Sequence, residues 1–384
     1  LKELVKTAGA ETVGTVIQNR ENIHPGTYLG KGKIQELKEM VWESGATGVV
    51  CDDELSPAQL KNLEDALDTK VMDRTMIILD IFAARAKTRE GKIQVELAQL
   101  RYRAVRLVGL RNSLSRLGGG IGTRGPGETK LEVDRRRIHE RISQLKSELQ
   151  DVERHRDVVR KQREQSGTLT AAIVGYTNAG KSTLLNKLTG AGILAEDKLF
   201  ATLDPTTRAL VLPGGEKVLL TDTVGFIRKL PHHLVEAFKS TLEEARYCDV
   251  ILHVVDCSNP QMDMQMHVVY ETLRRLDIKD KEIITVFNKV DRPDADTACR
   301  DMSADYKVRL SAKTGEGIGE LLDLFAVILR KRRIYFEKVF AYKNAGRIQT
   351  IRQSGQLLSE EYQDDGIHVK AYVPVELFEE LYKD

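Results

Sequence analysis

The sequence predicts an α/β protein with two regions of alternating strands and helices, a long antiparallel helical hairpin between them, and a small α+β domain at the end. Three observations support this fold class. Short β-branched runs alternate with helical patterns over residues 10–83 and again over 167–333. Apolar residues repeat with coiled-coil spacing on both sides of a glycine-rich break. Two alternating runs flank a turn near residue 365.

At about 150 residues per domain, the 384 residues of the chain suffice for several domains. We expect an N-terminal α/β domain (1–90), a helical hairpin (91–166) with a glycine-rich tip (114–130), a second α/β domain (167–333) and a small α+β C-terminal domain (334–384). The N-terminal domain has β-branched runs at 12–17, 48–51 and 71–73, and helical patterns at 34–43 and 58–68. Ser56 and Pro57 begin its second helix, as a capping residue and a proline at the first helical position.

The hairpin is predicted by apolar residues spaced alternately four and three positions apart. Six of seven seam positions are apolar in each of the two helices. The seam positions are Ile93, Leu97, Leu100, Ala104, Leu107, Arg111 and Leu114, then Ile138, Ile142, Leu145, Leu149, Val152, Arg156 and Val159. At 1.5 Å per residue the second helix extends roughly 45–50 Å, so we expect a projecting arm.

Positive charge is concentrated on this arm. Residues 85–164 contain 21 Lys and Arg against 11 Asp and Glu, whereas the whole chain has 59 against 57. Six glycines within residues 118–127 cannot form a core, but they allow a ligand to approach the backbone closely. We predict that the tip contacts phosphates of RNA through Arg116, Arg124 and Lys130. A solvated charged face and a flexible linker are the alternatives.

The second α/β domain contains a phosphate-binding loop. Candidate strands lie at 168–174, 208–212, 217–221, 250–255, 282–287 and 306–310. Gly175–Ser182 (GYTNAGKS) matches GxxxxGKS between an apolar strand and a helix at 183–188. The glycines let consecutive backbone N–H groups surround the phosphates. We expect Lys181 to reach the outer phosphates and Ser182 to bind Mg²⁺.

Three further motifs follow in the order of a Ras-like G domain. In Asp222–Gly225 (DTVG), the carboxylate fits a position behind the direct Mg²⁺ ligands and the glycine N–H can sense the terminal phosphate. In Asn288–Asp291 (NKVD), the aspartate can accept two hydrogen bonds from the Watson–Crick edge of guanine. In Ser311–Lys313 (SAK), the Ala312 N–H can contact the guanine carbonyl oxygen. The sequence therefore predicts a P-loop GTPase domain.

Four segments together resemble the HflX family of GTPases, over most of the chain. They are Asp53–Leu60, Gln94–Leu100, Gly118–Thr129 and Phe200–Thr207. The resemblance implies a bacterial-type GTPase that binds the large ribosomal subunit and splits or rescues stalled or idle ribosomes. It also implies that Thr202, rather than Thr206 or Thr207, supplies the second hydroxyl ligand of Mg²⁺.

Motifs and resemblance together define the expected GTP-binding residues: Gly175, Tyr176, Thr177, Asn178, Ala179, Gly180, Lys181, Ser182, Phe200, Ala201, Thr202, Leu203, Asp204, Asp222, Thr223, Val224, Gly225, Asn288, Lys289, Val290, Asp291, Ser311, Ala312 and Lys313.

The group that orients the attacking water is left open. Phe226 follows DxxG, where Ras-like enzymes have a glutamine, so we expect slow hydrolysis by the isolated protein and stimulation by the ribosome. Asn178 occupies the position that helps hold an activating K⁺ in similar G domains such as TrmE. The alternative is that Asn178 satisfies the loop backbone. Mg²⁺, and K⁺ under the first alternative, are the expected cofactors.

Two other functions stay open. A ribosome-assembly or tRNA-modification GTPase of the Era or TrmE type is less favoured, because neither a KH-like module nor a modification-domain cysteine is found. A nucleotide-gated interaction protein that regulates a protease or a membrane partner would not require turnover.

Composition argues against further classes. No stretch approaches the roughly 18 consecutive apolar residues of a membrane span, and the first twenty residues lack a signal-peptide pattern. The chain starts at Leu1 rather than Met, so an upstream piece is expected. Four cysteines without CxxC spacing (Cys51, Cys248, Cys257 and Cys299) favour reduced thiols. We expect a cytoplasmic monomer.

Overall fold

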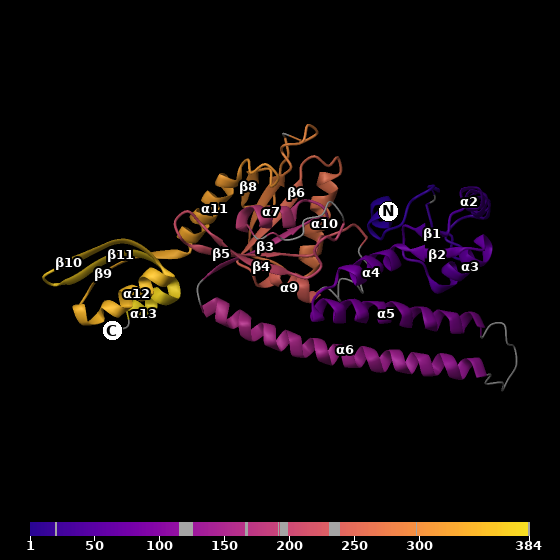
Figure 1. The fold of residues 1–384 in the computed structure, drawn as a ribbon, viewed down its shortest axis with the longest axis horizontal. Helices are drawn as coiled ribbons and strands as arrows, with labels where there is room; N and C mark the ends of the chain where they lie inside the picture. Colours follow the sequence, from indigo (N-terminus) through magenta and orange to yellow (C-terminus); the bar gives the residue numbers. More distant parts are fainter. Residues whose placement is uncertain are drawn as a thin grey trace. The chain divides into compact units, whose positions relative to one another are not determined.

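The computed structural model describes residues 1–19, 21–114, 126–165, 168–190, 192, 199–229, 239–296 and 298–382. The chain forms two compact units. The first comprises Leu1–Arg154, Glu196–Asp204 and Ile227–Leu242, and the second comprises His155–Ala195, Pro205–Phe226 and Glu243–Asp384. Each unit is described by itself below (Figure 1).

The N-terminal part of the first unit has a two-stranded parallel sheet surrounded by short helices. Its elements are α1 (Lys2–Thr7), α2 (Lys31–Ser44), β1 (Gly48–Cys51), α3 (Pro57–Leu67), β2 (Lys70–Asp73) and α4 (Arg74–Arg85). Helix α3 begins as predicted: Gln59 N donates to Ser56 Oγ at 3.2 Å, and Ser56 N donates to Gln59 Oε1 at 3.0 Å. Leu63 and Val71 are fully buried between these elements.

The β-branched run at residues 12–17 is not a strand, contrary to the sequence-based expectation. Val16 packs against the apolar core of this part, whereas Val13 and Ile17 are 59% and 74% exposed. Val16 therefore packs on this core without the run pairing its backbone with β1 or β2.

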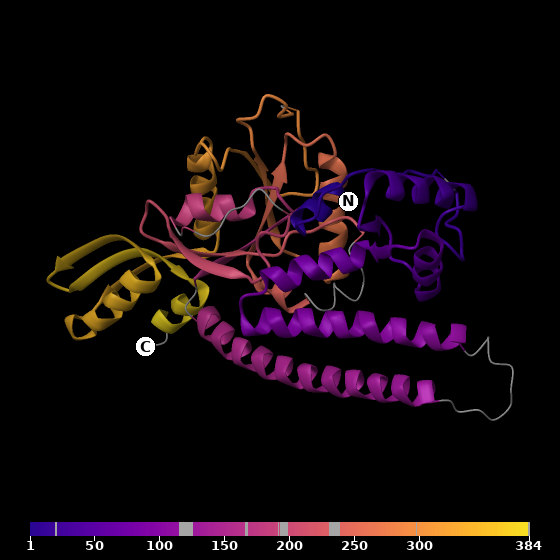
Figure 2. The same cartoon turned by 45° about the vertical axis from the view of Figure 1, so that its right-hand side comes forward.

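The helices α5 (Arg89–Leu114) and α6 (Pro126–Gln165) lie side by side in Figures 1 and 2. Ile93 and Leu97 of α5 and Leu145 of α6 are buried together, at positions of the predicted seam. Arg141 Nε donates to Glu96 Oε1 at 2.8 Å across the pair. Helix α6 has 40 residues and begins at Pro126, inside the segment 114–130 predicted as the tip. Proline is favoured at the first helical position, which explains the early start.

The second unit is built on a six-stranded sheet in the order β4-β5-β3-β6-β7-β8. Only β4 is antiparallel to its neighbour. The strands lie close to the predicted ranges: β3 (Leu169–Gly175), β4 (Thr206–Val211), β5 (Lys217–Asp222), β6 (Val250–Asp256), β7 (Glu282–Asn288) and β8 (Tyr306–Arg309). Among its described helices are α7 (Lys181–Thr189), α9 (Lys239–Tyr247), α10 (Met262–Arg275) and α11 (Ile318–Lys331), of which α9 crosses the boundary between the units.

The two faces of this sheet are covered by different helices. Leu184 of α7 and Phe325 of α11 share one buried cluster with Ile173 of β3. On the opposite face, the Tyr270 ring of α10 lies 5.1 Å from the His253 ring of β6. Parallel strands with helices on both faces place their carboxyl ends, and the loops that follow them, at one edge of the sheet.

A three-stranded antiparallel sheet of order β10-β11-β9 ends the chain. Its elements are β9 (Arg333–Phe340), η1 (Tyr342–Asn344), α12 (Ala345–Ser354), β10 (Gln356–Gln363), β11 (Gly366–Pro374) and α13 (Val375–Tyr382). In β9, Phe336 and Phe340 both face the core of this domain. Asp364 and Asp365 connect β10 to β11, at the turn that the sequence predicts.

No helix in the described part of the chain is both long enough and apolar enough to cross a membrane. The same residues contain no group of three or more His, Cys, Asp or Glu side chains arranged to hold a metal ion.

Candidate nucleotide-binding site

The phosphate-binding loop connects β3 to α7 at the carboxyl edge of the six-stranded sheet. Gly180 caps α7 with a φ of 98°, in the left-handed region that favours glycine. A Cβ atom at Gly180 would overlap Asn288 Nδ2. Glycine is therefore required here both by the backbone conformation and by the neighbouring loop.

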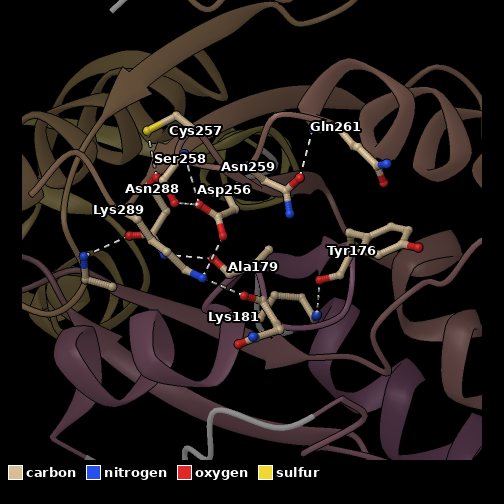
Figure 3. A network of polar contacts seen from close by, with 12 residues as sticks. Tyr176, Ala179, Lys181, Asp256, Cys257, Ser258, Asn259, Gln261, Asn288 and Lys289 are labelled. Carbon is tan, nitrogen blue, oxygen red and sulfur yellow. Dashed lines mark hydrogen bonds and ion pairs between the residues drawn. The ribbon is translucent and has the colours of Figure 1, made fainter. Parts of the chain in front are cut away.

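Lys181 is buried at the centre of this loop. Its Nζ donates to Tyr176 O at 3.0 Å, a bond visible in Figure 3. Burial lowers the pKa of Lys181 to about 8, the Asp222 carboxylate opposes this shift, and Lys289 adds to it. A buried ammonium group that is held by one carbonyl can become the partner of an anionic phosphate.

The hydroxyl and carboxylate expected near Mg²⁺ are adjacent. Ser182 Oγ donates to Asp222 Oδ2 at 2.7 Å, at the end of β5. Both are hard oxygen groups, which is the ligand chemistry that Mg²⁺ prefers. A Cβ atom at Gly225 would lie 2.8 Å from Thr177 Cα and 3.0 Å from Lys181 Nζ. Glycine thus allows DxxG to approach the loop, and the residues present fit a phosphate-bound Mg²⁺.

Phe226 joins DxxG to the phosphate-binding loop through its backbone. Its N donates to Gly175 O at 3.0 Å, and its carbonyl accepts from Thr177 N at 2.7 Å. The ring itself is only 2% exposed. Since the ring is apolar and buried, it cannot orient an attacking water.

The two segments expected to recognise guanine lie at the ends of β7 and β8. Asn288 Nδ2 donates to Ala179 O at 2.8 Å, and Asn288 Oδ1 accepts from Ala312 N at 2.9 Å. One asparagine therefore ties the phosphate-binding loop to the segment Ser311–Lys313. Asp291 is exposed, and a hydrogen bond from the Ser311 side chain lowers its pKa, so this carboxylate is ionised and can accept hydrogen bonds.

Sequence reasoning missed Asp256 at the end of β6. Lys289 Nζ donates to Asp256 Oδ2 at 2.7 Å (Figure 3). The same Nζ donates to Asn178 O at 2.9 Å. The sequence did contain a signal for Asp256. It is a carboxylate at the end of a predicted strand, and the ends of parallel strands lie at the ligand-binding edge of such a sheet. Asn178 has a φ of 63°, and its exposed side chain makes no hydrogen bond to the residues that the structure describes.

The segment Phe200–Asp204 belongs to the first unit. The ring of Phe200 is buried against Phe82 of α4, with centroids 4.7 Å apart. The Asp204 carboxylate accepts hydrogen bonds from Lys87 N and Thr88 N. The side chains of Phe200 and Asp204, both in the expected GTP-binding set, contact the N-terminal part.

The chain after DxxG also contacts the N-terminal part, at Arg228 and Lys229. Arg74 Nη2 donates to Arg228 O at 2.9 Å, and Lys229 forms an ion pair with Asp53. Burial alone would raise the pKa of Asp53, but hydrogen bonds from Lys229 and Tyr28 lower it. No local pattern in the sequence indicated these contacts.

Of the three cationic residues expected at the tip of the arm, Arg116 and Arg124 lie outside the described residues. Lys130 lies in α6.

Comparison with known proteins shows the family of the chain. Family models match residues 1–83 ("GTP-binding GTPase N-terminal"), 85–163 ("GTP-binding GTPase Middle Region") and 170–289 ("50S ribosome-binding GTPase"). A GTPase HflX from Lacrimispora saccharolytica is 74% identical over 99% of this chain and 90% of its own length. The corresponding protein of Caldanaerobacter subterraneus is 51% identical over 99% and 88%, and that of Escherichia coli is 46% identical over 83% and 76%. The chain belongs to the HflX family of GTPases.

Proposed function

We propose that this protein is a GTP-driven switch that binds the large ribosomal subunit and splits or rescues stalled or idle ribosomes. The observation that supports it best is the convergence of Gly175–Ser182, Asp222–Gly225, Asn288–Asp291 and Ser311–Lys313 at one edge of the sheet. The same chain contains a basic helical pair, and a family model named for 50S binding matches its G domain.

In this proposal the predicted residues act in three groups. Gly175–Ser182 surrounds the phosphates, with Lys181 on the outer ones. Asn288–Asp291 and Ser311–Lys313 bind guanine. Ser182 and Thr202 hold Mg²⁺, with Asp222 behind them, and the metal would offset phosphate charge during hydrolysis.

The N-terminal domain (1–90), the hairpin (91–166), the GTPase domain (167–333) and the C-terminal domain (334–384) are proposed as functional divisions. The hairpin contacts ribosomal RNA through Arg116, Arg124 and Lys130. The protein works as a monomer in the cytoplasm, where its partner is found.

Hydrolysis by the isolated protein should be slow. Phe226 cannot orient water, and residues that do so contribute strongly to turnover in related reactions. The large subunit should therefore raise turnover by orders of magnitude. If Asn178 holds K⁺, potassium should activate more than sodium.

The decisive experiment compares GTP turnover by the full chain alone, with large subunits, with small subunits and with protein-free ribosomal RNA. Sedimentation of intact ribosomes with GTP measures splitting in parallel. Stimulation by large subunits together with splitting supports the proposal. Stimulation by RNA alone would favour an assembly or RNA-modification role, and no stimulation would favour an interaction protein. A Ser182→Ala variant controls for turnover by contaminants.

A further inference from the structure

Asp204 is bound at the point where the arm begins. Its Oδ2 accepts from Lys87 N at 2.9 Å and from Thr88 N at 3.0 Å, and its Oδ1 accepts from Thr88 Oγ1 at 2.5 Å. Thr88 is also the cap of α5, since its Oγ1 accepts from Gly91 N at 3.0 Å. The carboxylate of Asp204 is thus hydrogen-bonded to the capping residue of the first arm helix.

The residue at position 91 is matched to this contact. A Cβ atom at Gly91 would overlap Asp204 Oδ1, so a larger residue would displace the carboxylate. An anion at a helix N-terminus is further stabilised by the backbone dipoles, and hydrogen bonds to a charged acceptor are the stronger kind. Thr88 therefore supplies the hydrogen-bond donor for the Asp204 carboxylate, and Gly91 supplies the space for it.

The segment that contains Asp204 is anchored at both ends. Phe200 is 1% exposed against Phe82 of α4, and Asp204 is bound at the start of α5. Thr202 lies midway between them. Movement of Thr202 along the chain direction must therefore strain one anchor or the other.

Helix α5 is in turn fixed farther along. Asp73, which is fully buried, accepts from Tyr102 OH at 2.7 Å and from Arg106 Nη2 at 2.6 Å, both on α5. A change at the first turn of α5 therefore acts on a helix that is already attached to the N-terminal part.

We propose that Asp204 is a positioning residue that couples nucleotide binding to the arm. The contact with Thr88 holds the segment that places Thr202, and nucleotide-dependent movement of that segment alters the cap of α5. This inference rests on the proposed function, in which Thr202 binds Mg²⁺. Coupling free energies are reciprocal, so occupancy of the arm by its ligand must alter nucleotide affinity by the same factor.

The test uses the full chain with Mg²⁺ and either GDP or a non-hydrolysable GTP analogue. The readouts are the ratio of the two affinities and the hydrogen exchange of the first-turn amides of α5, at Gly91 and Lys92. In the native protein, exchange at these amides should differ between the two nucleotides. Thr88→Val should reduce that difference and change the affinity ratio by about tenfold, as expected for one hydrogen bond to a charged group. Thr88→Ser, which keeps the hydroxyl, should restore both.

Two further variants separate coupling from damage to the helix. Gly91→Ala keeps the Thr88 hydroxyl but excludes the carboxylate, and it should act like Thr88→Val. Ser56→Ala removes an equivalent cap, from α3, without touching residues 200–204. It should leave both readouts at the native values.

The outcomes also separate this inference from the proposed function. The coupling would be overturned if Thr88→Val kept the native affinity ratio and the native difference in hydrogen exchange. It would also be overturned if Ser56→Ala changed these two quantities as much as Thr88→Val does. A native protein that hydrolyses GTP with ribosomal stimulation but shows identical exchange with both nucleotides would overturn the inference alone. A native protein that fails to bind GTP would remove both.

Discussion

We expect guanine recognition to depend on Asp291. Its ionised carboxylate accepts hydrogen bonds, whereas an amide in its place would present a donor to the N–H groups of guanine. Asp291→Asn should therefore weaken GTP binding by about 3 kcal/mol and favour xanthosine nucleotides. Competition binding with GTP and xanthosine triphosphate measures this. Asp294→Asn, an exposed carboxylate on the same loop, is the control, and unchanged guanine preference in Asp291→Asn would remove the assignment.

His253 makes the sheet sensitive to acid. Its side chain is buried, and its Nδ1 lies 3.9 Å from Asp301 Oδ2 without a hydrogen-bond partner among the described residues. Burial lowers the pKa of His253 from 6.5 to about 4, while Asp301 opposes the shift. The unfolded chain therefore binds more protons between these values, and stability falls as the pH drops below 6.5.

The size of this effect can be measured by substitution. Between pH 7 and pH 5, His253 should account for a loss of about 2 kcal/mol in the free energy of unfolding. Denaturant unfolding of His253→Leu at both pH values should show a correspondingly smaller loss. His267→Leu, which removes an exposed histidine, should keep the native pH dependence. An equal pH dependence in native protein and His253→Leu would contradict the assignment.

The pairing of α5 with α6 depends on a few apolar side chains. Leu145 is 1% exposed and packs with Ile93 and Leu97. Leu145→Ala should destabilise the pairing by about 2–5 kcal/mol, because it leaves a cavity in the seam. Val158→Ala, at a position 56% exposed, should change the free energy of unfolding by less than about 0.5 kcal/mol. Unfolding curves of the two variants would be indistinguishable if the seam contributed nothing.

For the molecule as a whole, we expect separate regions to serve ribosome contact and nucleotide binding. Arg124→Ala combined with Lys130→Ala should weaken ribosome binding. The slope of the logarithm of the binding constant against the logarithm of the salt concentration should fall in magnitude by about two, because each substitution removes one cation from a phosphate. GTP affinity of the isolated protein should stay native. Lys70→Ala with Lys307→Ala removes the same charge from exposed strand positions outside the arm. A tip variant that binds and splits ribosomes normally would show the glycine-rich segment to be a linker.

Local sequence patterns contain the nucleotide motifs and were enough to predict the strands and helices of the GTPase domain and the seam of the helical pair. These features are local: a glycine-rich loop between a strand and a helix, or apolar residues at helical spacing, are specified by neighbours along the chain. Where one side of an extended run packs without pairing, as at residues 12–17, local pattern is insufficient and the strand prediction was wrong.

Contacts between residues far apart in the chain became visible in the folded protein. Asp204 and Thr88 lie 116 positions apart, and Asp53 and Lys229 lie 176 apart. The composition of neither segment indicates its partner, because a carboxylate can cap any helix or pair with any cation. Their selection depends on how Phe200 is buried against Phe82 and where β2 leads into α4. The nucleotide motifs are therefore specified locally, whereas the contacts of Phe200, Asp204 and Lys229 with the N-terminal part are specified by packing.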